Sequence, residues 1–171
     1  MVEEAAILVD ALTVTRRVVW CVLTTVDRHG RPRNRVVHPV WELVEGPDGH
    51  DGERLRGWVT TRRSPVKSAH LAANPHVGCA YAGAEHDVAY FDCTAAWASA
   101  SERRHAWEVC RSVGAPAGFD PSAIWPAGPD SPGAEVLRLE PYRVQVGLAV
   151  DLAAGAAPRV WRGHEASTVS S

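Results

Sequence analysis

The chain has 171 residues, of which 46% are hydrophobic and 22% are charged, a composition typical of a single globular domain. Its net charge of −2 argues against nucleic acid as a partner, because proteins that neutralise phosphates are usually basic. No stretch approaches the roughly 20 apolar residues of a membrane span, and the acidic start at Glu3 and Glu4 is unlike the basic start of an export signal. We therefore expect a cytoplasmic protein that binds neither nucleic acid nor membrane.

The first half of the chain is predicted to hold one helix and three strands. Apolar residues recur at helical spacing over the first dozen positions, behind an acidic first turn. Residues 18–26 are β-branched and aromatic, as in a buried strand, and the chain returns through a second strand over 33–41. Pro39 cannot donate a hydrogen bond to a ladder, so it is expected at a sheet edge or bulge. A third strand is predicted over 55–61.

A short helix is predicted next, from Pro65 to about Ala73, followed by strands over 76–81 and 88–97. Ser99 and Glu102 have the spacing of a capping box and begin a further helix.

The last third is predicted to be an irregular loop over 115–134, a long strand over 136–148 that bends near Pro141, and a short strand over 159–162. Short turns between consecutive strands favour antiparallel pairing. About seven such strands favour a small closed or partly closed barrel. Residues 163–171 are expected to form a flexible tail.

The four cysteines are expected to be reduced thiols, because none forms a C-x-x-C pair. His76 and Cys79 form H-x-x-C, but no second pair stands at metal spacing, so we expect no metal site. Of the 18 basic residues, 17 are arginine and one is lysine, Lys67.

The segment around this lysine is the strongest candidate site. A strand ends in two threonines, Arg62 and Arg63 follow, and Ser64 then stands at the N-cap of a helix with Pro65 at its first position. Free N–H groups and the positive end of the helix dipole point outward there, and Lys67 adds a cation on the first turn. Two interpretations fit this pattern: a site for a phosphate monoester, or an ordinary helix start with solvated cations.

Four runs of residues follow one another at a characteristic spacing: Val22-Leu23-Thr24-Thr25-Val26-Asp27-x-x-Gly30-Arg31-Pro32, Val36-Val37-His38-Pro39-Val40-Trp41, Thr60-Thr61-x-x-Ser64-x-x-Lys67 and Leu71-x-x-Asn74-Pro75-x-Val77. No single run is diagnostic, but their order and spacing together are fairly specific. On these runs the chain, from about Arg17 to Val146, resembles the pyridoxamine 5'-phosphate oxidase-like, flavin-binding split-barrel family.

This resemblance implies a mainly β (α+β) fold: a six- to seven-stranded antiparallel split β-barrel with flanking helices, formed by a single flavin-binding domain over 1–162. It also implies a homodimer with two FMN sites at the subunit interface. The positions that match the family's cofactor-binding residues are Lys67, Ser64 and Arg62 for the phosphate, Thr60 and Thr61 for the ribityl chain and ring, and Arg35, Val36, Val37 and His38 along the isoalloxazine ring.

The resemblance implies an FMN-dependent oxidoreductase that transfers hydride to or from a small organic substrate. The last strand, Arg159 to Arg162, matches poorly the segment with which true pyridoxamine phosphate oxidases grip their substrate, so a different substrate is expected. Two alternatives remain open: a reductase that uses the deazaflavin coenzyme, and a non-catalytic carrier or sensor of flavin or haem. No catalytic acid or base is identified.

Two further residue types have more than one interpretation. His38 either has a role at the flavin, as a hydrogen-bond partner or as a proton carrier, or is an ordinary strand histidine with a protein partner. Most of the seven tryptophans are expected to fill the barrel and the interface, while Trp41 or Trp97 could line a flat pocket for an aromatic substrate.

Overall fold

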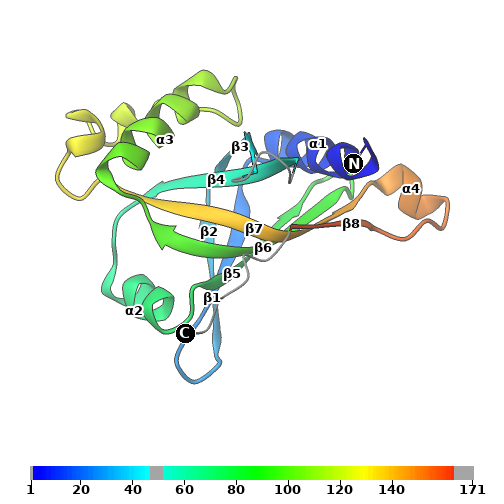
Figure 1. Cartoon of the computed structure of the whole chain (residues 1–171), viewed down its shortest axis with the longest axis horizontal. Helices are drawn as coiled ribbons and strands as arrows, with labels where there is room; N and C mark the ends of the chain where they lie inside the picture. Colours follow the sequence, from blue (N-terminus) through cyan, green and yellow to red (C-terminus); the bar gives the residue numbers. More distant parts are fainter. Residues whose placement is uncertain (1, 47–51, 164–171) are drawn as a thin grey trace.

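A computed structural model describes residues 2–46 and 52–163 of the chain. In these residues, strands form a single sheet, and helices flank it (Figure 1). The order is α1 (Val2–Val18), β1 (Cys21–Val26), β2 (Pro32–Val37), β3 (Val40–Glu45), β4 (Glu53–Thr61), α2 (Pro65–Ala73), β5 (His76–Ala82), β6 (Val88–Trp97), α3 (Ala100–Ser112), the 3-10 turns η1 (Pro121–Ala123) and η2 (Gly128–Asp130), β7 (Glu135–Gly147), α4 (Ala149–Ala153) and β8 (Arg159–Arg162).

The sheet confirms the expected mainly β, antiparallel class. Its strands run in the order β2-β1-β5-β6-β7-β4-β3, with β8 paired to β7, and every pairing is antiparallel. The described residues hold eight strands instead of the expected six to seven, because the strand predicted over 33–41 is two strands. It breaks between Val37 and Val40, where Pro39 has no N–H to continue a ladder. The two halves lie at opposite ends of the strand order.

Helix α1 is longer than predicted and closes the main core. It continues to Val18 and is followed by Val19 at a φ of 68°, so the next strand begins only at Cys21. Leu8, Ala11 and Val14 are almost completely buried and pack against the inward side chains of the sheet. Burial of this apolar face is the main reason for the helix to form there, since short helices gain most of their stability from packing.

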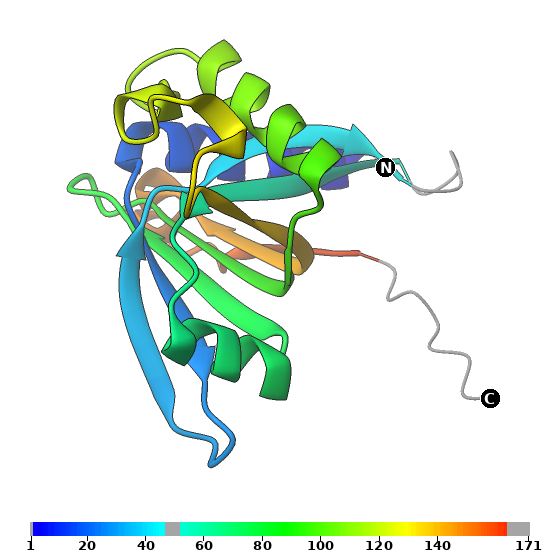
Figure 2. The same cartoon turned by 90° about the vertical axis from the view of Figure 1, so that its left-hand side faces the viewer.

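Helix α3 covers a second, smaller core. The predicted capping box is present: Glu102 N–H donates to Ser99 Oγ (3.3 Å), and Ser99 N–H donates to Glu102 Oε2 (2.8 Å). From this start, Ala106 and Cys110 are buried against Trp58 of β4. Figure 2 shows α3 at one end of the molecule and α2 at the other, beside the β1–β2 hairpin.

The late strands agree with prediction in outline. Asp92 pairs with Arg143 and Cys93 with Pro141, so the ladder shifts by one residue at the expected bend. Helix α4 was not predicted, and β8 has the predicted bounds. The expected tail lies outside the described residues, except for Gly163.

All four cysteines are free and buried. Burial raises the pKa of the Cys110 thiol to about 12, so this group is a poor nucleophile near neutral pH. Within residues 2–46 and 52–163, no three His, Cys, Asp or Glu side chains are grouped so that they could hold a metal ion. No helix in the same residues combines the length and apolar character needed to cross a membrane.

Candidate anion-binding site at the start of helix α2

Helix α2 begins as the sequence predicts. Ser64 is the N-cap in an extended conformation, and its hydroxyl accepts a hydrogen bond from Lys67 N–H at 3.2 Å. Pro65 occupies the first helical position, where its missing N–H leaves no bond unmade. No acidic residue lies in the first turn. The start of the helix is therefore positive both by its dipole and by its side chains.

Lys67 is a buried cation at this helix start. Only 7% of the residue is exposed. Its ammonium group donates to Thr61 Oγ1 at 2.6 Å and to the carbonyl of Arg62 at 3.2 Å. Burial lowers the pKa of Lys67, and the nearby charge of Arg35 lowers it further. Both effects show that the ammonium group is held in an environment that disfavours positive charge.

Arg35 brings a second cation to the same place from strand β2. Its guanidinium donates to Thr25 Oγ1 at 2.7 Å. Burial and the charge of Arg33 lower the pKa of Arg35. Within the described part of the chain, neither Arg35 nor Lys67 forms an ion pair with a carboxylate. The charge of Arg35 acts on Lys67, so two partly desolvated cations share this region without a carboxylate partner in the described residues, an arrangement that is costly unless an anion binds.

An aromatic ring borders this cluster. The guanidinium of Arg63 lies 4.5 Å from the centroid of the Trp97 ring, and the Lys67 ammonium lies 5.8 Å from it. Arg63 differs from the other two cations, because the Glu135 carboxylate is 3.6 Å away. Trp97 is therefore beside the candidate site.

Trp41, the other tryptophan proposed for a flat pocket, is a core residue. It is 3% exposed, stacks on Phe91 with ring centroids 4.4 Å apart, and donates its indole N–H to Tyr81 Oη at 2.8 Å. This packing leaves no ring face for a substrate.

Not every residue matched to the cofactor lies at this cluster. Thr61 contacts Lys67. Successive side chains of a strand point to opposite faces, so Thr60 points to the other face of β4, the one on which Trp58 packs against α3. Val37 packs against the main core, whereas Val36 is 68% exposed on the outer side of β2.

His38 lies in the β2–β3 connection and has a protein partner. Its Nε2 is 2.7 Å from the carbonyl oxygen of Ala117. Its ring lies between those of Phe119 and Trp20, at centroid distances of 4.6 and 5.3 Å. Burial lowers the pKa of His38, and the bond to Ala117 offsets part of that effect. The described contacts of His38 therefore fit the interpretation as a histidine satisfied by the protein.

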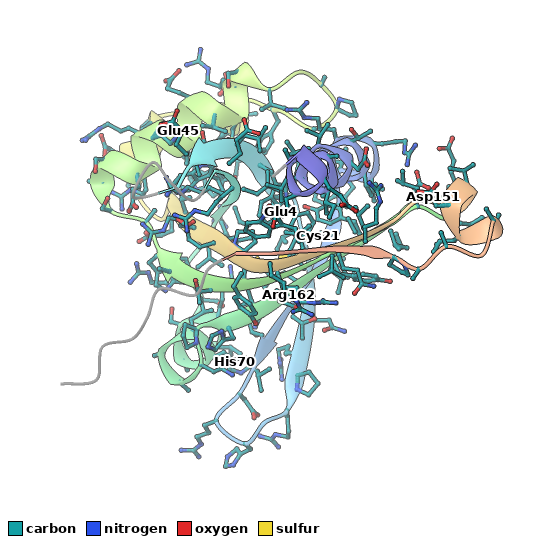
Figure 3. The ribbon with its side chains drawn as sticks, turned by 45° about the vertical axis from the view of Figure 1, so that its right-hand side comes forward. Glu4, Cys21, Glu45, His70, Asp151 and Arg162 are labelled. Carbon is teal, nitrogen blue, oxygen red and sulfur yellow. The ribbon has the colours of Figure 1, made fainter. Side chains whose placement is uncertain are left out.

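Two residues at this site were not singled out from the sequence. Thr25 of β1 is fully buried and bridges Arg35 and His70, whose Nδ1 lies 2.9 Å from Thr25 Oγ1. Figure 3 shows His70 on α2, close to the β1–β2 hairpin. Thr25 resembles any β-branched strand residue in the sequence. The only available signal was the i, i+3 spacing of Lys67 and His70, which places them on one side of α2.

Comparisons with known proteins assign the fold. No family model and no curated protein matches the chain. Among solved structures, it is similar to a Clostridium acetobutylicum protein related to general stress protein 26 of Bacillus subtilis, of the pyridoxinephosphate oxidase family. The TM-score is 0.64 at 12% identity, over 93% of this chain and 95% of that chain.

Two further solved structures share the fold. General stress protein 26 from Bacillus anthracis has a TM-score of 0.58 at 15% identity, over 95% of this chain and 99% of that one. A haem-binding protein from Mycobacterium smegmatis has a TM-score of 0.59 at 16% identity, over 90% of this chain and 57% of that one. At these identities the comparisons confirm the resemblance at the level of the fold, a pyridoxamine 5'-phosphate oxidase-like split barrel.

Proposed function

We propose that the chain binds FMN through its 5'-phosphate at the start of α2 and acts as an FMN-dependent oxidoreductase on a small organic substrate. One observation carries this proposal: the buried ammonium of Lys67 at the start of α2, and the guanidinium of Arg35, which Thr25 links to His70 of the same helix, have no carboxylate partner in the described residues. A phosphate dianion would neutralise both groups.

The residues present fit a phosphate monoester. Pro65 has no N–H and the Lys67 N–H already donates to Ser64 Oγ, so the Ser64 hydroxyl and the Val66 N–H are the neutral donors that this helix start offers a phosphate group. Lys67 supplies a charge-assisted hydrogen bond, and Arg35 supplies a planar fork that suits two phosphate oxygens. Both side chains are already held by hydrogen bonds, Lys67 to Thr61 and Arg35 to Thr25, so little conformational entropy is lost when the anion binds.

When bound, FMN supplies the hydride chemistry, as cofactors generally do. The task left to the chain is to bind and orient it. In our proposal Arg35 binds the phosphate, while Thr61 and the segment from Val36 to His38 lie along the ribityl chain and the ring, as the family resemblance implies. His38 then acts by shape and not as a proton carrier, since its Nε2 already contacts the Ala117 carbonyl.

We further propose that two copies associate through the outer side of β1 and β2. Val36 is 68% exposed and its register partner Val22 is 39% exposed, while Trp20 nearby is 60% exposed. Apolar groups so gathered are typical of protein interfaces. Light scattering should therefore show a dimer, and Val36→Asp should shift it toward the monomer. A wild-type monomer that still binds flavin would contradict this part of the proposal.

The absorption spectrum of the purified protein, with mass spectrometry of any small molecule released on denaturation, tests the cofactor. Release of FMN, or saturable binding of added FMN, supports the proposal. Release of the deazaflavin coenzyme would assign the chain to the alternative reductase. A protein that neither releases nor binds a flavin nucleotide would refute both.

A second candidate is a non-catalytic carrier or sensor, which the similarity to the haem-binding protein from Mycobacterium smegmatis favours. The two candidates differ in turnover. Rapid reoxidation of the reduced cofactor by a defined electron acceptor is expected of the enzyme. A tightly held cofactor that no acceptor reoxidises, or retention of haem in place of flavin, is expected of the carrier.

A further inference from the structure

A single buried hydroxyl links the three elements around the anion site. Thr25 of β1 is 0% exposed. Its Oγ1 lies 2.7 Å from Arg35 Nη1 of β2 and 2.9 Å from His70 Nδ1 of α2.

The direction of one bond in this bridge is determined by chemistry. A guanidinium only donates, so the Thr25 oxygen accepts from Arg35. Towards His70 Nδ1 the hydroxyl either donates its hydrogen or accepts a second hydrogen bond, according to the tautomer of His70. In both cases the hydroxyl links Arg35 to α2.

The bridge matters because Arg35 has no other described anchor. The charges of Arg33 and Lys67 repel it, and no carboxylate in the described residues pairs with it. Without the Thr25 oxygen, the flexible Arg35 side chain would be expected to turn toward water, where its charge is better solvated.

We propose that Thr25 is a positioning residue for phosphate recognition: through its contact with His70 it holds the Arg35 guanidinium against α2, the helix that carries Lys67, so that one anion meets both cations. This inference rests on the proposed function. Thr25 acts through Arg35 and does not touch the ligand. It therefore sets the preference for a phosphorylated flavin over the same flavin without phosphate.

The test compares FMN with riboflavin, which lacks the phosphate, in titrations of flavin fluorescence. Thr25→Val keeps the shape and the β-branching but removes the hydroxyl. We expect it to weaken FMN binding about tenfold and to leave riboflavin binding within about twofold. Thr25→Ser restores the hydroxyl and should restore FMN affinity. A Thr25→Val protein that keeps the wild-type preference for FMN overturns the proposal, and so does equal weakening of both ligands.

A matched control is available on the same strand. Thr24 is the neighbouring residue, and its hydroxyl bonds to Asn34 Oδ1 at 2.7 Å on the opposite face of β1. Thr24→Val should leave both affinities unchanged. If Thr24→Val weakens FMN binding as much as Thr25→Val does, a general loss of strand stability explains the effect and the positioning role is wrong.

A double-mutant cycle separates positioning from structural support. In an Arg35→Met protein the hydroxyl has nothing left to position, so adding Thr25→Val should not weaken FMN binding further. Additive losses contradict the proposal. This cycle can be run with Thr25→Ala if Thr25→Val does not fold.

The proposed function and this inference can fail separately. A wild-type protein that binds FMN no more tightly than riboflavin refutes the phosphate site, and the inference with it. If the wild type does prefer FMN, a crystal structure of Thr25→Val without a ligand tests the inference alone: an Arg35 side chain turned away from α2 supports it, and an unmoved side chain overturns it.

Discussion

Lys67→Met is the substitution that tests the anion site most directly. Methionine keeps most of the unbranched side chain, so the packing of this 93% covered residue changes little, while the charge and the bonds to Thr61 and Arg62 are lost. A charge-assisted hydrogen bond contributes about 1.5–3 kcal/mol. FMN affinity is therefore expected to fall about 10- to 150-fold.

The stability of the ligand-free protein should not fall with the affinity. Burial and Arg35 already disfavour the charged form of Lys67, as its lowered pKa shows. Removing the charge relieves both penalties and offsets the loss of the two hydrogen bonds, so the free energy of unfolding in urea should stay level or rise. A loss of affinity together with unchanged or higher stability is a result that a purely structural lysine would not give.

The assay is a fluorescence titration with FMN and with riboflavin, and Arg111→Met serves as the control. Arg111 is a half-exposed arginine of α3, so its removal changes the net charge by the same amount outside the site. Unchanged FMN affinity in Lys67→Met would remove the lysine from the site. Equal losses in both variants would show that only long-range charge matters.

Three further results are expected. The phosphate requires the ammonium form of Lys67, and the pKa of Lys67 is lowered. FMN affinity should therefore decrease as the pH rises, with a midpoint below 10.5, the ordinary pKa of a lysine. A midpoint at or above 10.5 contradicts the burial argument. Hydrogen bonds from the Arg31 N–H and the rest of the 27–31 turn lower the pKa of Asp27 to about 2, so the stabilisation it provides is complete above its ordinary value of 3.8 and is lost as the pH falls toward 2. Asp27→Asn should flatten that part of a stability-versus-pH curve from urea unfolding, and an unchanged slope would assign the acid loss to other groups. A Cβ at Gly57 would lie 2.7 Å from the Trp41 ring, so Gly57→Ala should lower the unfolding free energy by about 1–3 kcal/mol. Gly78→Ala is the control, because a Cβ there would have no atom within 4 Å. Thermal melts compare the two variants, and equal melting temperatures would show that Trp41 can move.

Short-range signals explain why the helix starts were predictable. The N-cap serine, the proline at the first helical position and the capping box act within three or four residues, so they can be identified without knowing the fold. The same locality placed Lys67 on the first turn of α2. It did not indicate that the ammonium group would be buried, because burial depends on Thr61 and on the strand packed beside it.

The boundaries of β2 and β3 could not be predicted from sequence patterns. Residues 33–41 look like one continuous strand, and only the pairing of each half with a different neighbour divides it at Pro39. His38 illustrates the same point, since its partner Ala117 is 79 residues away in a loop without regular spacing.

The amino-acid sequence alone thus determined the antiparallel β class, the helix that begins at Ser64 and the presence of a cation on it, because each follows from hydrogen-bonding rules that operate over a few neighbouring residues. The tertiary structure decided which charges meet. Arg35 is linked to α2, the helix that carries Lys67, only because β2 pairs with β1 and α2 packs beside that hairpin, and the Thr25 bridge spans 45 residues to His70. Contacts between residues so far apart in the sequence depend on how the whole sheet is arranged, and no local sequence pattern predicts that arrangement.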